Sequence, residues 1–384
     1  MNKRLAIITT HPIQYYAPVF RLLHERKKTD IMVFYTWGEQ SQQKFDPGFN
    51  KTIQWDIPLL DGYPFTWVKN TSPDPGTHHR KGIINPGLVQ DITDWKADAI
   101  LVFGWAWKSH LSAMRHFKGK IPVYFRGDST LLQDSSPLKK ITRFLWLKWV
   151  YRHVDTAFYV GTNNKAYYLN YGLRENQLVF APHAADNERF KPVHAADAGE
   201  FRTRLGLGAS DVLVLYAGKF EPVKNLALLI SAFLETPGRQ AHLLLVGNGL
   251  LEQQLKTLAG DYARIHFMDF QNQSAMPVIY QACDLFCLPS VSETWGMAVA
   301  EAMASGKAVL VSDKVGCAID LVKNEQNGDI FESGNQSDLA KKLGELTASS
   351  EKLKKMGRRS SGIIQNWSFA EIVKVIEKKL NEKN

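Results

Sequence analysis

Short apolar runs alternate with amphipathic stretches through the first half of the chain. Apolar runs bounded by turn residues predict buried strands, and apolar residues three or four positions apart predict helices. The predicted strands are RLAIITT, IMVFYTW, DAILVFG, IPVYFRG and TAFYVGT, and the predicted helices are YAPVFRLLHERK, residues 108–117 and PLKKITRFLWLKWVYRHVD. Residues 38–87 are rich in Pro, Gly, Asp and aromatic residues, and we interpret them as loops with short strands.

The alternation continues in the second half. Strands are predicted at DVLVLYAGK, AHLLLVGNG, RIHFMDF, DLFCLPS and KAVLVSD, and helices at NLALLISAFLE, GLLEQQLKTLA, AMPVIYQAC and GMAVAEAMASG. Strands that alternate with helices form βαβ units and hence a parallel sheet. Two such sets, with a Pro-containing stretch near 182–195, predict two Rossmann-like domains joined by a linker. Ligands bind beyond the carboxyl ends of parallel strands, so we expect the active site in a cleft between the domains.

Length and composition agree with this organisation. The chain has 384 residues, of which 45% are hydrophobic and 22% are charged, which suffices for two cores. We expect an N-terminal domain over 1–190, a C-terminal domain over 191–365 and a last helix over 366–384. The N-terminus lacks the features of a secretory signal, and no stretch is apolar for long enough to span a membrane.

Cysteine content and charge narrow the location and the partners. Cys283, Cys287 and Cys317 are odd in number and two of them lie in an apolar stretch, which predicts free thiols and a reducing, cytoplasmic compartment. The net charge of +9 is concentrated in the first half and the C-terminal tail, which favours an anionic partner. No nucleic-acid recognition motif is present, so we expect no nucleic-acid partner and favour anionic lipid headgroups.

Two glutamates frame the most informative segment, LPSVSETWGMAVAEAMASG. A strand ends at Pro289, a loop carries Glu293, and a helix is predicted from about Gly296 to Ser305. Glu301 follows Glu293 by eight residues, about two helical turns, and is expected to face a similar way. Such a pair suits a polyol ligand, because charge-assisted hydrogen bonds to hydroxyls are short and directional. The neighbouring helix N-terminus favours a diphosphate.

This segment resembles the Glu-x7-Glu signature of glycosyltransferase family 4, with Glu293 and Glu301 at its ends. Spacing alone would also fit a solvated helix face, but the flanking EAMASG and SDKVGCAIDLV are similar to the family too. The resemblance implies an α/β fold of the GT-B kind, with two Rossmann-like domains facing across a cleft and a C-terminal helix that crosses back to the first. It implies that Glu293 binds hydroxyls of the transferred sugar and that Glu301 binds the ribose. It extends over 155–375 and is much weaker over 1–150.

Two lysines follow a predicted strand in YAGKFEPVKN. Lys219 and Lys224 stand at a strand end and beside a helix N-terminus, where two cations can bind a diphosphate; two surface lysines are the alternative. Their charge would stabilise a nucleoside-diphosphate leaving group as the glycosidic bond breaks. The family has an Arg or Lys and then a Lys five residues later, and Lys219, which follows Gly218, and Lys224 match this pattern. We expect Glu293, Lys219 and Lys224 to form the catalytic group.

Further donor-binding residues are expected in three short segments. The turn at Gly247 and Asn248 would let the backbone approach the nucleotide closely. By the resemblance, the turn at Phe270 and Gln271 contacts the base. The remaining expected donor contacts follow the first glutamate directly and are Thr294, Trp295, Gly296 and Met297.

The first domain offers candidates for the acceptor side. Many family members place a His after the strand equivalent to IPVYF, but this chain has FRGDS, so Arg126 or Asp128 is expected to take that place. His11, which follows the first strand, and His110, in GWAWKSH, are the other candidates. His183 lies near the linker and is a weaker candidate. For each of them, packing at a strand end or in a loop is the structural alternative.

No cofactor and no metal are expected. His78 and His79 precede Arg80 and Lys81 in a basic cluster, but no further ligand stands at a spacing typical of zinc sites. A solvated loop, or a loop that contacts an acceptor phosphate, fits this cluster better. No Asp-x-Asp motif of the metal-dependent GT-A kind stands near a strand end, and the lysine pair can take over the role of a metal.

Residues 138–152 are apolar on nearly all sides of a predicted helix. Such a helix is ordinarily buried. The alternative is an interfacial segment, with Trp146 and Trp149 at headgroup depth and its Lys and Arg residues on anionic lipid. The sequence leaves both interpretations open.

Residues and resemblance together predict a retaining, hexosyltransferase-type enzyme. It would move a sugar from a nucleoside-diphosphate sugar, UDP favoured and GDP as the alternative, to a hydroxyl of a saccharide or lipid-linked saccharide in polysaccharide or envelope glycan synthesis. No carboxylate stands as a covalent nucleophile, and the family resemblance implies same-face attack, in which the leaving phosphate oxygen takes the acceptor proton. The predicted location is cytoplasmic, with a peripheral position on the inner membrane face as a further candidate. A GT-B sugar-nucleotide epimerase and a catalytically silent GT-B binding subunit are the alternatives.

Overall fold

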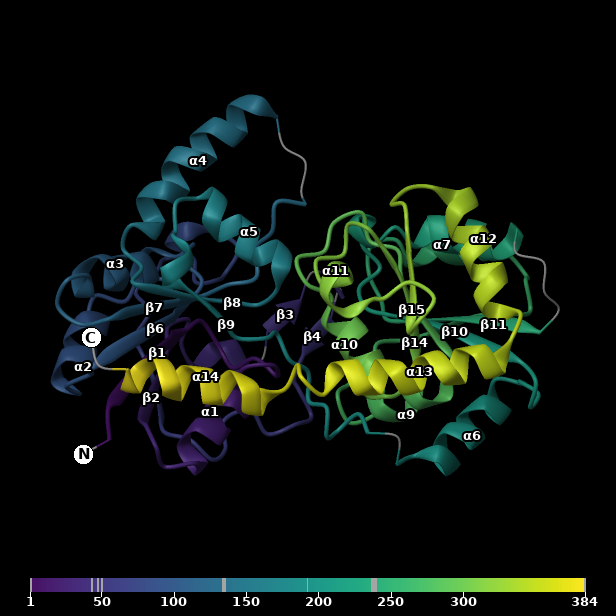
Figure 1. Ribbon diagram of the computed structural model, residues 1–384, viewed down its shortest axis with the longest axis horizontal. Coiled ribbons are helices and arrows are strands. Elements are labelled where there is room, and N and C mark those ends of the chain that lie inside the picture. The colour runs from purple at the N-terminus through teal and green to yellow at the C-terminus, as the bar shows by residue number, and fades with distance from the viewer. Residues whose placement is uncertain are drawn as a thin grey trace. The chain divides into compact units, whose positions relative to one another are not determined.

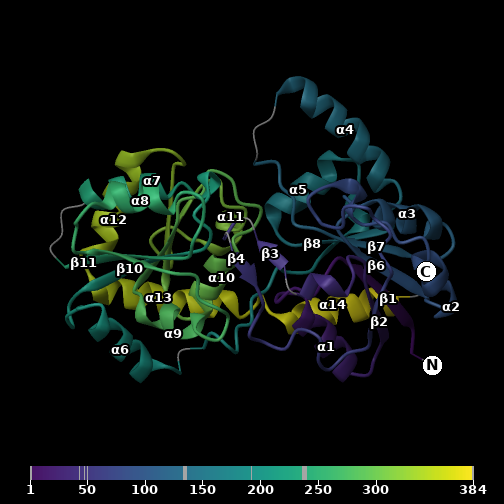
Figure 2. The same cartoon turned by 180° about the vertical axis from the view of Figure 1, so that it is seen from behind.

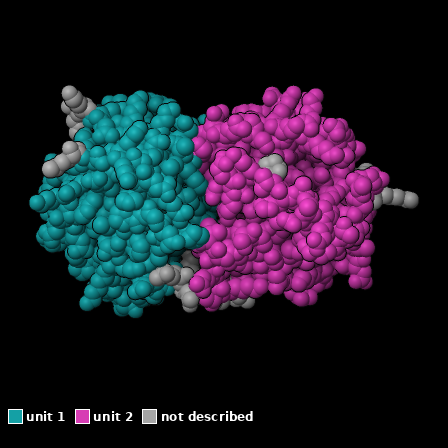
Figure 3. All heavy atoms as spheres, turned by 90° about the horizontal axis from the view of Figure 1, so that it is seen from below, with its two compact units in different colours: residues 1–44, 58–183, 369–384 teal, residues 45–57, 184–368 magenta. Residues whose placement is uncertain are grey.

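Two parallel sheets organise the computed structural model of the protein (Figure 1). The structure describes residues 2–42, 44–46, 48–49, 51–132, 136–191, 193–235 and 240–382. It divides into unit 1, with residues 1–44, 58–183 and 369–384, and unit 2, with residues 45–57 and 184–368 (Figure 3). The sequence places the boundary at 190, whereas the units divide after His183, and the sequence does not predict that 45–57 belongs to unit 2.

Seven parallel strands form the sheet of unit 1, in the order β5-β2-β1-β6-β7-β8-β9. They are β1 (Arg4–Thr9), β2 (Asp30–Tyr35), β5 (Phe65–Trp67), β6 (Ala99–Phe103), β7 (Val123–Arg126), β8 (Thr156–Tyr159) and β9 (Leu178–Phe180). In the interior strand β1, Ile7 pairs with Val33 of β2 on one side and Leu101 of β6 on the other. All three side chains are 0% exposed. Continuous burial is what a parallel sheet with helices on both faces requires.

Helices cover both faces of this sheet (Figures 1 and 2). On one face α1 (Ala17–Glu25) packs beside α14 (Phe369–Asn381), and on the other lie α2 (Leu88–Asp94), α3 (Lys108–Phe117), α4 (Pro137–Tyr151) and α5 (Thr162–Asn170). Arg26 Nε lies 3.0 Å from Glu377 Oε1, and Lys3 Nζ donates to the carbonyl of Leu380 at 2.7 Å. The last helix therefore belongs to unit 1, as the resemblance implies.

Six parallel strands form the sheet of unit 2, in the order β12-β11-β10-β13-β14-β15. They are β10 (Val212–Ala217), β11 (Ala241–Val246), β12 (Ile265–Met268), β13 (Leu285–Leu288), β14 (Ala308–Ser312) and β15 (Gly328–Phe331). Each strand predicted in the second half of the sequence is present. Cys283, Cys287 and Cys317 are free and buried in this unit, in agreement with the prediction of free thiols.

The helices of unit 2 lie in two layers (Figures 1 and 2). One layer has α7 (Leu226–Glu235), α8 (Glu252–Ala259) and α12 (Gln336–Thr347), and the other has α6 (Ala195–Arg204), α9 (Met276–Ala282), α10 (Met297–Ala304) and α13 (Ser350–Ile364), while the short α11 (Ala318–Leu321) follows β14. The side chain of Asn335 accepts from Asp338 N at 3.0 Å and caps α12. Asn187 Nδ2 donates to the carbonyls of Ile364 and Trp367, both at 3.1 Å. These bonds connect the beginning of residues 184–368, the long segment of unit 2, to its end.

A two-stranded sheet lies within residues 38–87, which the sequence predicts as loops with short strands. It pairs β3 (Lys44–Asp46) with β4 (Lys51–Ile53), and residues 45–57 count with unit 2. An isolated hairpin is marginally stable in water. Its stability therefore depends on the surface of unit 2 against which it packs.

Helix α4 projects from unit 1 (Figures 1 and 2). Large apolar side chains on its N-terminal part are exposed: Leu138 by 79%, Ile141 by 59%, Phe144 by 37% and Leu145 by 63%. Burial is confined to the C-terminal part of the helix, at Leu147, Val150 and Tyr151. The interpretation of the whole segment as a buried helix is therefore wrong for its first half, whose apolar side chains stay exposed even though Arg143 lies over the ring of Tyr167 in α5. In the described part of the chain, no helix combines the length and the apolar character needed to cross a bilayer.

Candidate active site

The sheet of unit 2 reverses its strand order between β10 and β13, which are neighbours. Connections that leave these two strands turn to opposite sides, which opens a crevice at their carboxyl ends. Lys224 follows β10 and Glu293 follows β13, and their side chains meet there, with Lys224 Nζ donating to Glu293 Oε2. Each side chain is 19% exposed. The sheet topology thus joins two of the three predicted catalytic residues.

The loop that carries Glu293 is fixed by the segment after β14. Glu293 N donates to Lys314 O at 3.1 Å, and Gly316 N donates to Glu293 O at 3.0 Å. A Cβ at Gly316 would lie 1.8 Å from the carbonyl oxygen of Thr294, so no side chain fits there. Gly316 is therefore a supporting residue to which the sequence analysis assigned no role, although it stands within the family-like segment SDKVGCAIDLV.

Glu301 lies in a different environment from Glu293. Helix α10 begins at Met297, after Gly296 with its φ of 102°, so Glu293 precedes the helix and helical spacing does not relate the two carboxylates. Glu301 is 5% exposed, and the hydroxyl of Tyr280 in α9 donates to its Oε2 at 2.9 Å. Tyr280 was not predicted as a partner of Glu301.

Backbone contact joins the turns after β10 and β11. Gly218 N donates to Val246 O at 2.9 Å. Gly247 has a φ of 144°, and a Cβ there would lie 1.9 Å from the carbonyl oxygen of Gly218. Only glycine suits this close approach. The two glycines predicted as donor contacts are therefore neighbours in space.

Asn248 braces the next turn with its side chain. Its Nδ2 donates to Glu252 Oε2 at 2.9 Å and to Asp269 Oδ1 at 3.0 Å, and its Oδ1 accepts from Phe270 N at 2.8 Å. Gln271 follows, with its Nε2 donating to Asp269 O at 3.1 Å. Asn248 thus holds the predicted base-binding turn in place through its side chain.

Lys219 pairs with a carboxylate that the sequence analysis did not identify. Its Nζ lies 2.8 Å from Asp46 Oδ1 in β3, and its backbone carbonyl accepts from the hydroxyl of Tyr216 at 2.8 Å. Burial, followed by the charge of Glu293, raises the pKa of Tyr216 well above its ordinary value.

Trp295, also a predicted donor contact, is 2% exposed, and its ring lies 5.1 Å from that of Trp367.

In unit 1, Arg126 lies at the end of β7 and is buried. Its Nη1 donates to Ala181 O at 2.9 Å and its Nη2 to Pro182 O at 2.7 Å. Burial, and then the charge of Arg126, lowers the pKa of His183 to about 3. The ring of Tyr16 stacks on His183 at a centroid distance of 6.1 Å.

Asp128 belongs to the same group. Its charge is the second cause, after burial, that raises the pKa of Tyr16. Arg126, Asp128, His183 and Tyr16 therefore form one cluster in unit 1, of which Tyr16 was not predicted.

The other two histidine candidates differ in burial. His11 is partly buried, with its Nδ1 2.8 Å from Thr10 Oγ1 and its ring edge-on to Trp37. His110 is 0% exposed; its Nδ1 lies 2.9 Å from Gly104 O and its Nε2 lies 2.8 Å from Thr36 Oγ1. Burial lowers the pKa of His110 to about 4. Because both ring nitrogens are engaged inside unit 1, His110 is a packing residue in this structure.

His78 and His79 have one further potential ligand, Asp74. The Nε2 atoms of both rings lie 3.2 Å from Asp74 Oδ2, and one ligand atom from each residue falls within 4.8 Å of the others. The sequence analysis did not identify Asp74 because it precedes the histidines in a turn-rich loop. Asp74 and His78 are well exposed, and the Nε2 atom of each ring already lies within hydrogen-bond distance of Asp74.

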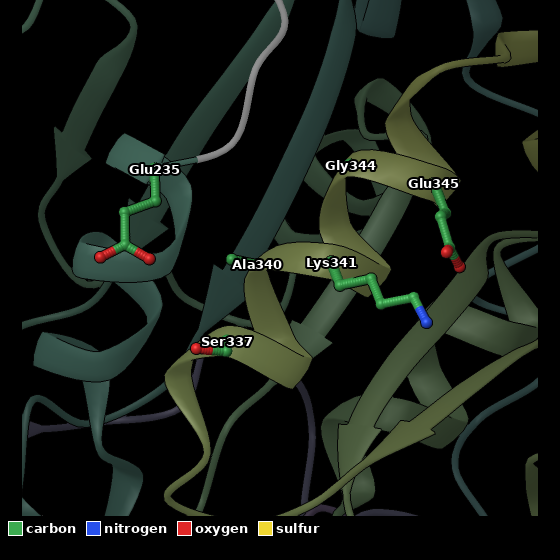
Figure 4. A pocket seen from close by; sticks show the side chains of 6 residues that line it. All are labelled: Glu235, Ser337, Ala340, Lys341, Gly344 and Glu345. Atoms are coloured by element: carbon green, nitrogen blue, oxygen red, sulfur yellow. The ribbon is translucent and has the colours of Figure 1, made fainter.

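A hollow of about 440 Å³ lies elsewhere in unit 2, where the end of α7 faces α12 (Figure 4). It is lined by Glu235, Ser337, Ala340, Lys341, Gly344 and Glu345. None of these belongs to the predicted donor residues. Two carboxylates and a single lysine do not favour a diphosphate.

Part of the chain is similar in sequence to a known protein family and to proteins of known activity. Residues 197–361 match the family model described as glycosyl transferases group 1. D-inositol 3-phosphate glycosyltransferase of Nocardia farcinica is 30% identical over 212 residues, which cover 52% of this chain and 46% of that protein. The chain thus spans less than half the length of this relative.

Similar solved structures cover nearly the whole chain. The Anabaena protein HepE, crystallised with UDP and glucose, superposes with a TM-score of 0.73 at 20% identity over 99% of both chains. Sucrose-phosphate synthase of Thermosynechococcus elongatus gives a TM-score of 0.75 at 19% identity over 98% of both chains. The chain has the GT-B fold, and its residues 197–361 match the family of glycosyl transferases group 1.

Proposed function

We propose that the protein is a retaining glycosyltransferase that moves a sugar from a nucleoside-diphosphate sugar to a hydroxyl of a saccharide or lipid-linked saccharide. The observation that carries the proposal is the Lys224–Glu293 pair at the β10/β13 switch point. A cation and a carboxylate at this edge of the sheet provide one group for a diphosphate and one for sugar hydroxyls.

The reaction assigned to this site breaks the bond between the anomeric carbon and the diphosphate oxygen. The acceptor oxygen bonds to the same face of that carbon, and its proton goes to the departing phosphate oxygen. Lys219 and Lys224 stabilise the negative charge that grows on the diphosphate, which is the largest contribution expected of fixed charges in such a site. Glu293 binds hydroxyls of the transferred sugar, and Glu301 binds the ribose.

The paired state of Lys224 prepares the site for this chemistry. A lysine held by Glu293 at 19% exposure has already lost much of its hydration and side-chain freedom. Less reorganisation is then needed when the diphosphate arrives. Acting in this way, the lysines make a metal ion unnecessary, and we propose metal-independent transfer.

A UDP-sugar is the donor that we favour over a GDP-sugar. HepE, which shares this fold, was crystallised with UDP and glucose. A sugar-nucleotide epimerase is the second candidate, because it too would use two Rossmann-like domains. It would convert the nucleotide sugar without an acceptor, whereas a transferase releases the nucleoside diphosphate at full rate only when acceptor is present.

Substitution of the pair tests the proposal. Lys224→Ala and Glu293→Gln are each expected to lower the transfer rate by about 100- to 1,000-fold, because each removes one charge from the reacting group. Nucleotide release would be measured with a panel of UDP- and GDP-sugars and saccharide acceptors. Lys118→Ala is the matched control, because it breaks a similar lysine–carboxylate pair, with Asp155, in unit 1. Full activity in both site variants would overturn the assignment.

For helix α4 we propose an anionic membrane surface as the partner. The exposed side chains of Leu138, Ile141 and Leu145 share this helix with Lys139, Lys140, Arg143 and Lys148, and the helix has no acidic residue. Apolar side chains among cations suit the boundary between headgroups and acyl chains. Trp146 lies near Trp105 at 6.5 Å and is partly buried against the core, so the aliphatic residues and Phe144 would enter the lipid instead. This places a cytoplasmic enzyme peripherally on the membrane, near a lipid-linked acceptor.

A further inference from the structure

The β3–β4 hairpin contacts all three turns that are expected to hold the nucleoside diphosphate. At the turn after β10, a Cβ on Gly48 would lie 2.5 Å from Lys219 Cδ. At the turn after β11, the Gly48 carbonyl oxygen lies 2.9 Å from where a Cβ of Gly249 would stand. At the turn after β12, the ring of Phe49 lies 4.8 Å from that of Phe270. Gly48 and Phe49, which form the described part of the hairpin tip, therefore lie against the proposed diphosphate and base positions within unit 2.

Asp46 is held at this tip by its own backbone and by Lys219. Its Oδ1 accepts from Gly48 N at 2.9 Å and from Phe49 N at 3.4 Å, and it lies 2.8 Å from Lys219 Nζ. The side chain is 15% exposed. Burial acts to raise the pKa of Asp46, but the hydrogen bond and charge of Lys219 outweigh burial and keep this pKa below its ordinary value.

The other half of the hairpin is anchored separately. Lys51 Nζ lies 3.3 Å from Asp269 Oδ2, and Asn272 Nδ2 donates to Gln54 O at 2.8 Å. Asp56 accepts from both the backbone N, at 3.2 Å, and the hydroxyl of Ser274. The hairpin can therefore stay attached to unit 2 when the bond between Asp46 and Lys219 is broken.

A carboxylate that stays on the same ammonium group as a diphosphate repels it. Glu293, which pairs with Lys224, has sugar hydroxyls to bind in the proposed complex, whereas the proposed site assigns Asp46 no group of the donor. We propose that Asp46 is a specificity-determining competitor of the diphosphate: it occupies Lys219 in the free protein, is displaced by the donor, and returns when the product leaves. The inference rests on the proposed function, because it needs Lys219 as the diphosphate ligand. Its consequence is that ligands with a diphosphate can displace Asp46, whereas a nucleoside without phosphate has no charge with which to compete.

Asp46→Asn provides the test, with UDP and uridine as the probes and isothermal titration calorimetry as the measurement. UDP is expected to bind Asp46→Asn on the order of 10-fold more tightly than the unaltered protein, because no ion pair must be broken and no repelling carboxylate remains. Uridine binding should change by less than about 2-fold. Stopped-flow measurements should show slower release of UDP from the variant.

Asp56→Asn is the matched control. It removes the same charge from the segment 45–57, just after β4, at a residue that binds Ser274 rather than Lys219. It should leave UDP affinity within about 2-fold of the original. A double-mutant cycle adds Lys219→Ala, in whose presence Asp46→Asn should raise UDP affinity by less than it does in the unaltered protein, because the ion pair that UDP must break is already absent. Equal or weaker UDP binding by Asp46→Asn would overturn this inference alone. If neither UDP nor GDP binds the unaltered protein, the proposed function fails and the inference fails with it.

Discussion

His110 and His183 are imidazoles that folding removes from water. His110 is 0% exposed and His183 is 5% exposed. Burial disfavours the charged form of both rings, and for His183 the neighbouring Arg126 adds repulsion. Unit 1 therefore carries two neutral histidines at positions that the sequence offers as candidates for the acceptor side.

Acidification should destabilise the fold through these residues. The pKa of His110 falls on folding from 6.5 to about 4, so between these values the unfolded chain binds more protons than the folded protein. Stability is complete above pH 6.5 and is lost as the pH falls from 6.5 towards 4, by about 3 kcal/mol for His110.

Histidine Cε1–H NMR signals provide the measurement. The signal missing from His110→Asn identifies His110, which should not titrate between pH 8 and pH 5 in the folded protein, whereas all imidazoles should titrate near 6.5 in denaturant. A midpoint close to 6.5 in the folded state would show that the ring is solvated.

Site residues could be predicted where their signal is local in the sequence. Glu293 and Lys224 follow apolar strands within a few positions, and strand ends in a parallel sheet share one edge. Asp46, which binds Lys219, and Tyr280, which binds Glu301, had no such signal. Each lies far along the chain from the residue that it binds. Hydrophobic periodicity shows which face of an element is buried but not against which element it packs.

At the scale of elements, α4 differs most from its prediction. An apolar helix was expected to be covered, and its C-terminal part is, by the sheet of unit 1. The N-terminal part extends beyond that sheet, and sequence periodicity contains no information on where a covering surface ends. Short strands were expected within residues 38–87, but not their positions at 44–46 and 51–53, because these strands are too brief to show alternation.

Vesicle binding should depend on the exposed residues of α4. Leu138→Ser, Ile141→Ser and Leu145→Ser combined are expected to weaken binding to vesicles of phosphatidylcholine with phosphatidylglycerol by about 100-fold, since half-burial of each apolar side chain at the lipid interface contributes roughly 1 kcal/mol. Sedimentation with the vesicles measures it. Vesicles of phosphatidylcholine alone should bind weakly, because the cations of α4 then lack a partner.

Leu258→Ser with Ile319→Ser is the control for this prediction, because both side chains are exposed, by 40% and 52%, but lie outside α4. These two substitutions should leave vesicle binding unchanged. If the α4 variant bound vesicles as well as the unaltered protein, the helix would not be the membrane-contacting element.

At the scale of the whole molecule, the sequence predicted the fold well. Alternating strands and helices identify two Rossmann-like sets, and long central strands such as β1 and β10 lie within the predicted runs. The strand order, and the membership of 45–57 in unit 2, depend on pairing between distant segments. Those features have no local signature.

Ligand binding should stabilise the folded protein without any metal. UDP at about 100 times its Kd adds about 2.7 kcal/mol to the free energy of unfolding, which corresponds to a rise in Tm of roughly 5 to 10 °C. A thermal denaturation scan measures the shift. The same rise is expected in excess EDTA, and its loss on chelation would show that a metal takes part in nucleotide binding.

The chain passes from one unit to the other after residues 44, 57, 183 and 368. During synthesis, unit 2 has all its residues once the ribosome has passed 368, while unit 1 still lacks α14. The unit that starts first is therefore finished last. Until α14 emerges, the side of α1 that packs on α14, and Arg26 at the end of α1, lack this contact. Nascent chains tend to aggregate through surfaces exposed in this way. Loss of the last helix would accordingly impair the N-terminal half of the protein, far away in sequence.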